Sequence, residues 1–290
     1  MAVVIATRDR PEQLEACLAG VRASIEPGDE LIVVDSCSSS PRTAEVAAAG
    51  GATLVRLDVP GASKARNAGW QAARSQVVAF VDDDVRVAKS WAAGIRQAFA
   101  AHPEAAFVSG RLGLLEQDRG SARPVALIDF DRPYVIDASR VRDLGHGANL
   151  AIRRAPLEAV GGYDEQLGPG ARWPAAEDLD LIDRLVLAGY TGRYDPAAAA
   201  WHVQWRRRSD LLSLEWRYGL GQGARLGLLR RRSRSRYRDL ARMVWSDLGV
   251  RELGRCLSKG RRLGTVLVVV RLVGTAVGQL GVTVVGRRGT

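Results

Sequence analysis

Four short apolar runs alternate with segments of helical periodicity in the first part of the chain. These runs are Val3–Ala6, Leu31–Val34, Thr53–Leu57 and Val77–Val81. Between the first two, apolar residues recur at the spacing of one helix face, at Leu14, Cys17, Leu18 and Val21. Short strands that alternate with helices indicate βαβ units. We therefore predict an α/β fold with a mostly parallel sheet flanked by helices.

The segment before the fourth run has the features of a helix that packs closely on a sheet. One of its faces consists of small residues, namely Ala65, Ala68, Gly69 and Ala72. Ser63 stands at the start of this segment, and serine is a preferred N-cap residue. We predict that Ser63 caps the helix.

Polar residues follow each of the four apolar runs. They are Thr7 and Arg8, Asp35 and Ser36, Asp58, and the run Asp82, Asp83 and Asp84. The carboxyl ends of neighbouring parallel strands line one crevice, where ligands bind. For any single run, an exit into a polar loop is the simpler interpretation. The four together favour a binding site at this edge of the sheet.

The three adjacent aspartates need either full exposure to water or a positive charge close by. Neighbouring carboxylates repel one another, and the loss of water strengthens the repulsion. A solvated turn would tolerate them, whereas a divalent cation would use them, because Mg²⁺ and Mn²⁺ prefer hard oxygen ligands shared between carboxylates and phosphates. Lys64 and Arg66 lie in the first turn of the preceding helix, where backbone N–H groups favour a diphosphate. Alone, such a basic pair would indicate only a solvated face.

Two later segments supply candidates for the chemistry. A predicted helix begins with Glu177 and Asp178. Acidic residues are common in a first helical turn for dipole reasons, but one of them could also serve as a general base. A last apolar run ends at His202. A lone histidine is more often structural, yet an imidazole could complete a metal site built from carboxylates.

Charge is unevenly distributed along the 290 residues. Residues 1–202 carry 22 Lys and Arg against 27 Asp and Glu, whereas residues 203–290 carry 20 against 5. The apolar stretch 263–286 within the basic part is long enough to span a bilayer, but Arg271 and Gln279 interrupt it. We expect it to lie on an anionic membrane surface or to cover a substrate site; a helix buried in a globular cap is the alternative.

The compartment is also indicated by the sequence. The start of the chain shows no export signal. The three cysteines have neither disulfide nor zinc spacing. Both features favour a reducing cytoplasm, so we expect a cytoplasmic protein, with peripheral attachment to the cytoplasmic face of the membrane as an option.

Five stretches resemble a known family in order and spacing. They are VVIATRDRPEQLEACL, LIVVDSCSSS, ASKARNAGWQAARSQVVAFVDDDV, GANLAIRRAPLEAVGGYDEQL and AEDLDLIDRLVLAGY. Together they resemble family 2 of the nucleotide-sugar glycosyltransferases, which are inverting enzymes of the Rossmann-like GT-A fold. The resemblance covers about residues 2–205. It implies a catalytic domain over residues 1–205, followed by a basic, partly apolar helical region over residues 206–290.

The resemblance also assigns roles to individual residues. It implies a nucleoside-diphosphate sugar as donor, Mn²⁺ or Mg²⁺ as cofactor, and transfer of the hexosyl type to a hydroxyl acceptor. Residues expected to contact the nucleotide or the donor sugar are Thr7, Arg8, Asp35, Lys64, Arg66, Asp82 and Asn149. Residues expected to bind the metal are Asp84, Asp82 and His202. Asp178 matches the usual general base, with Glu177 beside it.

Two details of the pattern are informative. Asp82 and Asp84 occupy the outer positions of the family's Asp-X-Asp motif, so we expect Asp83 between them to matter least. Ser36 stands where many members have a second acidic residue, which leaves the choice of donor nucleotide open. The acceptor also stays open between a lipid-linked glycan and a small natural product.

Two other function classes are weighed against this one. A sugar-phosphate nucleotidyltransferase would share the fold and the metal, but such enzymes carry a Gly-rich loop after the first strand, and ATRDRPEQ contains no glycine. A nucleic-acid or lipid-binding module could use the basic C-terminal third. That region lacks a recognised nucleic-acid-binding signature, so nucleic acid is the disfavoured partner.

Overall fold

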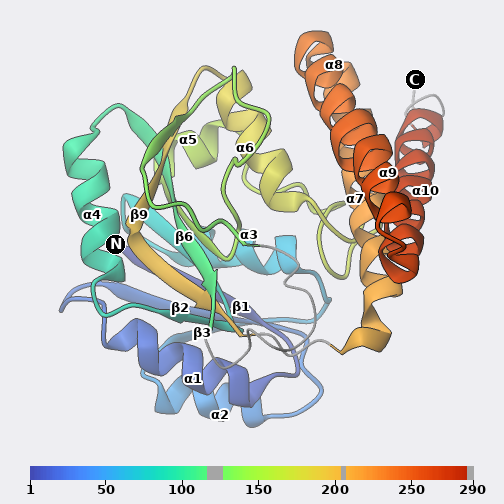
Figure 1. Ribbon diagram of the computed structural model, residues 1–290. Coiled ribbons are helices and arrows are strands. Elements are labelled where there is room, and N and C mark those ends of the chain that lie inside the picture. Colours follow the sequence, from blue (N-terminus) through green and yellow to red (C-terminus); the bar gives the residue numbers. More distant parts are fainter. Residues whose placement is uncertain (116–126, 204–206, 286–290) are drawn as a thin grey trace. The chain divides into compact units, whose positions relative to one another are not determined.

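The computed structural model describes residues 1–115, 127–203 and 207–285 (Figure 1). The chain divides into two compact units. The first comprises Met1–Glu165 and Leu181–Trp205, and the second comprises Gln166–Asp180 and Arg206–Thr290. The expected boundary between residues 205 and 206 lies outside the described residues. The assignment of a catalytic domain to residues 1–205 stays a prediction.

The described part of the first unit contains a nine-stranded sheet in the order β3-β2-β1-β4-β8-β6-β9-β5, with β7 paired to β9. The four predicted strands form its parallel half: β1 (Ala2–Thr7), β2 (Glu30–Ser36), β3 (Thr53–Leu57) and β4 (Val77–Asp82). The mixed half contains β5 (Val85–Val87), β6 (Ala105–Leu114), β7 (Tyr134–Ile136), β8 (Asn149–Arg153) and β9 (Thr191–His202). There β8 is antiparallel to both β4 and β6, whereas β6 and β9 are parallel.

Helices pack on both faces of this sheet. They are α1 (Pro11–Arg22), α2 (Arg42–Ala49), α3 (Ala62–Ala72), α4 (Trp91–Ala101) and α5 (Arg154–Ala159). A further helix, α6 (Glu177–Leu187), begins in the second unit. The apolar face of α1 joins the main core with Val3 and Ile5 of β1. Gly69 of α3 lies against Val4, on the other face of the same strand, and a Cβ at Gly69 would come within 2.3 Å of Val4 Cγ1. The predicted close packing of this small-residue helix is therefore confirmed.

The prediction that Ser63 caps helix α3 is wrong. The helix begins at Ala62 with Gly61 at the N-cap position, and Ser63 is buried in the first turn. The Gly61 N–H donates instead to Ser36 Oγ at 2.9 Å. The end of β2 therefore fixes the start of α3, a contact between residues 25 positions apart that local propensity does not reveal.

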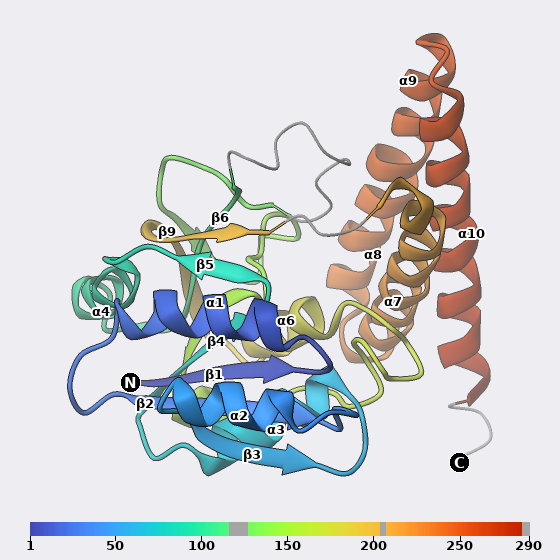
Figure 2. The ribbon, with the colours of Figure 1, turned by 90° about the horizontal axis from the view of Figure 1, so that it is seen from below.

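The second unit is helical. It contains α7 (Leu211–Arg232), α8 (Arg234–Arg242), a π-helical stretch (Met243–Arg251), α9 (Glu252–Ser258) and α10 (Arg262–Val285). Figure 2 shows α7 and α10 side by side. Glycines allow this approach, since a Cβ at Gly223 would lie 2.1 Å from Thr275 O and one at Gly278 would lie 2.2 Å from Leu220 O.

The segment Gln166–Asp180 packs with these C-terminal helices. Leu167, Ala224 and Val282 form one buried cluster, with Trp173 against it. A Cβ at Gly221 of α7 would lie 2.5 Å from Ala175 O, so the two backbones are in close contact. The C-terminal helices thus support the segment that leads into α6.

Candidate donor and metal site

The carboxyl ends of the parallel strands meet as expected. Thr7 of β1 is paired in register with Asp35 of β2, and Ala6 is paired with Asp82 of β4. The polar residues after these strands therefore lie along one edge of the sheet. The prediction that they converge is confirmed.

Asp82, Asp84 and His202 form a cluster at this edge. One ligand atom from each of the three lies within 4.8 Å of the others. Asp82 ends β4, Asp84 follows in the turn to β5, and His202 ends β9, where it is paired with Val85. The distance between His202 Nε2 and Asp84 Oδ1 is 3.8 Å. Two carboxylates and an imidazole at this spacing fit a divalent cation such as Mn²⁺ or Mg²⁺.

Arg66 favours the ionised form of Asp82, the first of these candidate ligands. Its Nη2 donates to Asp82 Oδ1 at 2.8 Å, and its side chain is 8% exposed. Burial by itself raises the pKa of Asp82, but Arg66, His146 and His202 outweigh it, and the pKa is lowered from its usual value. The guanidinium also lies 5.5 Å from the ring centroid of Tyr163. Asp82 is therefore held in its ionised form.

Asp83, between the two candidate ligands, is held by two hydrogen bonds. Its carboxylate accepts hydrogen bonds from Thr7 Oγ1 at 2.8 Å and from Arg10 Nη1 at 3.1 Å. Burial raises the pKa of Asp83 to about 6; Asp84 and Asp82 add to the rise, while Arg10 and Thr7 oppose it. The expectation that Asp83 matters least is therefore not supported by its surroundings.

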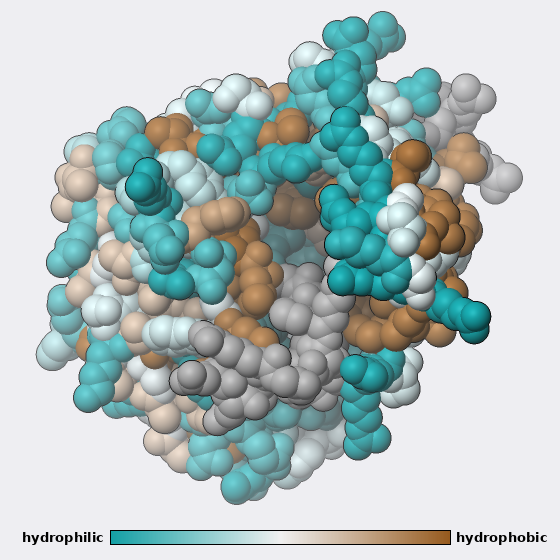
Figure 3. All heavy atoms as spheres, viewed as in Figure 1, coloured by the Kyte–Doolittle hydropathy of each residue, from teal (hydrophilic) through white to brown (hydrophobic). Residues whose placement is uncertain are grey.

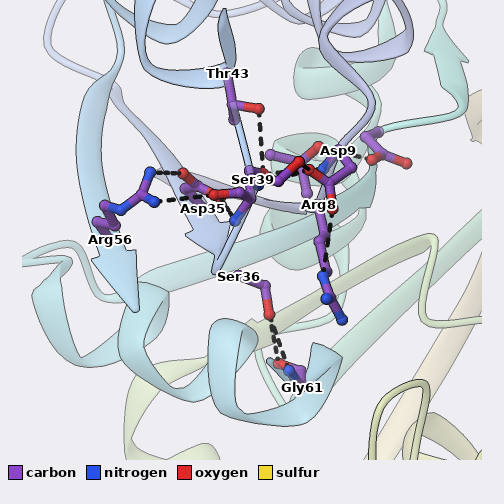
Figure 4. A network of polar contacts seen from close by, with 11 residues as sticks. Arg8, Asp9, Asp35, Ser36, Ser39, Thr43, Arg56 and Gly61 are labelled. Atoms are coloured by element: carbon purple, nitrogen blue, oxygen red, sulfur yellow. Dashed lines mark hydrogen bonds and ion pairs between the residues drawn. The ribbon is translucent and has the colours of Figure 1, made fainter. Parts of the chain in front are cut away.

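Asp35 and Ser36 hold the loops around this edge (Figure 4). Asp35 is fully buried and accepts from Arg56 Nη1 at 2.7 Å and from the Ser38 N–H at 2.8 Å. Ser36 bonds to the backbone of Gly61 at the start of α3. Both side chains therefore hold loops at this edge of the sheet, and the predicted contact of Asp35 with the nucleotide stays a prediction.

Arg8 and Lys64 are the accessible cations among the predicted residues. The side chain of Arg8 is 51% exposed and lies 3.5 Å from Asp9 Oδ2. Asp9, with a positive φ of 52°, accepts from the N–H and the hydroxyl of Ser39, which joins the loops after β1 and β2. Lys64 is partly exposed in the first turn of α3. Both can approach an anionic ligand without breaking a buried contact.

Asn149 has a structural position. Its Nδ2 donates to the carbonyls of Arg111 and Ala198, each at 2.8 Å, and its Oδ1 accepts from Trp91 Nε1 at 2.8 Å. Only 1% of the residue is exposed. These bonds join β8 to β6, β9 and α4. The predicted contact of Asn149 with the donor sugar stays a prediction, and its geometry favours a supporting role.

Glu177 and Asp178 lie in the first turn of α6, in the part of the helix that belongs to the second unit. Glu177 is 8% exposed and Asp180 is 1% exposed, whereas Asp178 is partly exposed. Asp180 pairs with Arg232 of α7 at 2.5 Å. Asp178 is therefore the most accessible carboxylate of this turn, as a general base requires.

Comparison with known families decides what kind of chain this is. A family model described as "Glycosyl transferase family 2" matches residues 2–160. The chain belongs to this family. The resemblance inferred from the sequence is confirmed. The match favours a glycosyltransferase over a nucleotidyltransferase, and it ends before the basic C-terminal region.

Relatives of this family 2 chain include the pre-mycofactocin glycosyltransferase of Mycobacterium tuberculosis, which is 30% identical over 228 residues. That match covers 76% of this chain but 46% of the relative, so the chain spans less than half of the curated protein. A second relative, the probable glycosyltransferase YdaM of Bacillus subtilis, is 37% identical over 70 residues, 22% of this chain and 15% of that protein.

Solved structures agree on the fold. The mannosyltransferase PcManGT of Pyrobaculum calidifontis, in complex with GDP-Man and Mn²⁺, matches with a TM-score of 0.68 at 17% identity and covers 96% of this chain and 86% of that one. TarS of S. aureus, in complex with UDP, matches with a TM-score of 0.57 at 14% identity, covering 100% and 91%. The family 2 chain therefore has the GT-A fold with a helical C-terminal region.

Two contacts near the site were not predicted from the sequence. His146 lies edge-on to His202 with 6.2 Å between the ring centroids. Asn67 of α3 donates to Tyr163 O and Glu165 Oε1, each at 3.0 Å, which holds Tyr163 beside Arg66. The stretch GHGANLAIRR did contain His146, but its position at the site depends on the path of a long irregular segment.

Proposed function

We propose that this family 2 chain is an inverting glycosyltransferase that transfers a sugar from a nucleoside-diphosphate sugar to an acceptor hydroxyl. The observation that carries the proposal is the cluster of Asp82, Asp84 and His202 within 4.8 Å, at the strand edge of a GT-A fold. Carboxylates at this edge suit a ligand that combines a metal ion and a diphosphate.

In this proposal Asp82, Asp84 and His202 hold Mn²⁺ or Mg²⁺. When bound, the cation supplies electrostatic stabilisation for the negative charge that develops on the departing nucleoside diphosphate. Arg66 keeps Asp82 ionised through its 2.8 Å hydrogen bond. The accessible cations Arg8 and Lys64 bind diphosphate oxygens.

The loops on the nucleotide side are fixed by polar contacts. The ion pair of Asp35 with Arg56 holds the loop after β2. The hydrogen bond between Ser36 and Gly61 holds the start of α3. Thr7 is bonded to Asp83 at the end of β4. We assign Thr7 and Asp35 to the shaping of the pocket that receives the base and ribose, and Asn149 to the support of the donor-sugar side.

Asp178 is the proposed general base. It accepts the proton from the acceptor hydroxyl while that oxygen forms a bond to the anomeric carbon of the donor. The bond from this carbon to the diphosphate oxygen breaks on the opposite face, so the configuration inverts and the nucleoside diphosphate leaves. General-base catalysis of this kind contributes about 10²–10⁴-fold. Glu177, buried beside Asp178, is assigned to the orientation of this turn.

The acceptor proposed is a lipid-linked glycan or a small natural product. One relative is named for pre-mycofactocin. We propose that the enzyme works in the cytoplasm, with peripheral contact to the membrane.

An assay of donor cleavage tests the proposal. The purified chain is incubated with labelled nucleoside-diphosphate sugars, Mn²⁺ and candidate acceptors, and the release of nucleoside diphosphate is measured. Asp178→Asn is expected to lower turnover about 10²–10⁴-fold while donor affinity is kept. Glu104→Gln, a change at an exposed carboxylate, serves as the matched control. Turnover of Asp178→Asn close to that of the control would remove the assignment of the base.

A further inference from the structure

Helix α10 presents an apolar face. The exposed residues between positions 263 and 282 are Leu263, Val266, Val269, Val273, Val277 and Leu280, each 43% to 66% exposed. They recur at intervals of three or four, so they form one row along the helix. At 1.5 Å per residue this row is about 26 Å long. Figure 3 shows apolar residues gathered over α9 and α10.

The polar groups of α10 face other helices of the same unit. Arg271 lies 2.5 Å from Glu215 of α7, and its guanidinium lies 5.7 Å from the ring centroid of Tyr218. Gln279 Nε2 donates to the hydroxyl of Tyr237 at 3.0 Å. Arg271 and Gln279, which in the sequence counted against contact with a bilayer, are therefore turned away from the exposed row.

The glycines of α10 also have partners in the helical unit. A Cβ at Gly274 would lie 2.9 Å from Trp216 O, and one at Gly278 would lie 2.2 Å from Leu220 O. Both glycines thus serve the contact with α7. The exposed row is left with only valine and leucine in the described range 263–282.

Basic residues near the exposed row of α10 indicate which kind of surface binds it. Exposed cations lie in α9 at Arg255, in the following turn at Lys259 and Arg261, and at the start of α10 at Arg262, near exposed Leu257. The part of the chain from residue 203 onward carries 20 basic against 5 acidic residues. Two copies of so basic a surface would repel each other, whereas anionic lipid headgroups attract it by about 1 kcal/mol per basic residue near the surface.

We propose that the face Leu263–Leu280 of α10 binds the surface of a bilayer that contains anionic lipids. Arg262–Val282 is long and apolar enough to cross a membrane by length and composition, and 28% of its apolar window is buried. A crossing would carry the Arg271–Glu215 pair to the centre of the bilayer, which is costly. The helix therefore lies in the interface, with its polar side against α7 and its basic turn on the headgroups.

Vesicle flotation of the full chain tests this proposal. The probes are phosphatidylcholine vesicles with and without phosphatidylglycerol. The wild type is expected to float with the anionic vesicles and to be released by high salt. Val273→Glu/Val277→Glu is expected to weaken partitioning at least about tenfold. Val59→Glu, a change at a 55% exposed valine of the first unit, is the matched control and keeps the wild-type binding.

Further variants distinguish interfacial binding from a membrane crossing and from a dimer. Arg261→Glu/Arg262→Glu is expected to remove the preference for anionic vesicles, and the milder Val277→Ser tests the row if the double glutamate variant does not fold. Flotation unchanged by the valine substitutions, retention in alkaline carbonate, or a dimer in light scattering that Val273→Glu dissociates would each overturn the proposal. No sugar donor is used, so the result is independent of the proposed transferase activity.

Discussion

Thr7 Oγ1 donates a hydrogen bond of 2.8 Å to Asp83 Oδ2, across 76 positions of sequence. The bond joins the end of β1 to the end of β4, and Arg10 reaches the other oxygen of the same carboxylate at 3.1 Å. Asp83 therefore fixes the turn that carries Asp82 and Asp84. The middle aspartate of the run therefore has a structural role at the edge that carries the candidate metal ligands.

Asp83→Ala is expected to destabilise the fold by about 1–3 kcal/mol, because the buried Thr7 hydroxyl loses its acceptor. Urea denaturation measures this loss. Thr7→Val and the double variant complete a thermodynamic cycle, in which the coupling energy should exceed about 0.5 kcal/mol. Strict additivity of the two changes would contradict the structural role given to this bond.

The four parallel strands and their meeting edge were predictable, because each run is short, apolar and followed by a polar residue. The sequence suggested that His202 could complete a carboxylate metal site, but only the resemblance paired it with Asp82 and Asp84, since His202 lies 118 positions after Asp84. The role of Asp83 was missed because alternate residues near a strand end point to opposite sides, and the sequence does not name Thr7 as its partner.

The segment Gln166–Asp180 shows a second limit of sequence reasoning. Its association with the C-terminal helices depends on the contact of Gly221 with Ala175 and on the ion pair of Asp180 with Arg232. Local periodicity gives no sign of either. The sequence therefore did not predict that the basic C-terminal region supports the turn that contains Asp178.

Arg232→Met is expected to destabilise the helical unit by about 2–4 kcal/mol, because the nearly buried Asp180 loses its cationic partner. Thermal unfolding followed by circular dichroism measures the loss. Arg230→Met, a change at an exposed arginine of the same helix, is the control. Addition of Asp180→Asn to Arg232→Met should restore part of the stability; a further loss of equal size would argue against the pair.

Gly278→Ala is expected to cost about 1–3 kcal/mol, because the added methyl group would lie 2.2 Å from Leu220 O and force α7 and α10 apart. Gly254→Ala in α9 is a matched control, since nothing lies within 4 Å of a Cβ there. That control should gain up to about 1 kcal/mol from helix propensity. Equal unfolding midpoints for the two variants would show that the helices do not need the glycine contact.

The carboxylate of Glu30 is expected to make the free energy of unfolding depend on pH. Its carboxylate accepts from the Arg74 and Ser75 N–H groups and from the Ser75 hydroxyl. Burial raises the pKa of Glu30, but the hydrogen bonds lower it by more, so that the pKa lies below its usual value. The stabilisation is therefore present above the pKa of the unfolded chain, about 4.3, and is lost as pH falls through the folded value.

Glu30→Gln should remove this contribution. The variant is expected to be less stable than the wild type at pH 7, and the difference should shrink as the pH falls below about 4. Urea midpoints across the pH range measure it, with Glu104→Gln as the exposed control. A difference that stays constant with pH would contradict the role of the carboxylate charge.

The central claim is that Asp82, Asp84 and His202 bind a divalent cation together with the diphosphate of a sugar donor. A thermal-shift screen of nucleoside-diphosphate sugars with Mn²⁺ or Mg²⁺ tests it most directly, because a ligand that binds only the folded chain raises its apparent stability. The account predicts that one donor raises the unfolding temperature of the wild type only with the cation, and that Asp84→Asn removes the effect. An equal shift in a chelator, or in Asp84→Asn, would contradict it.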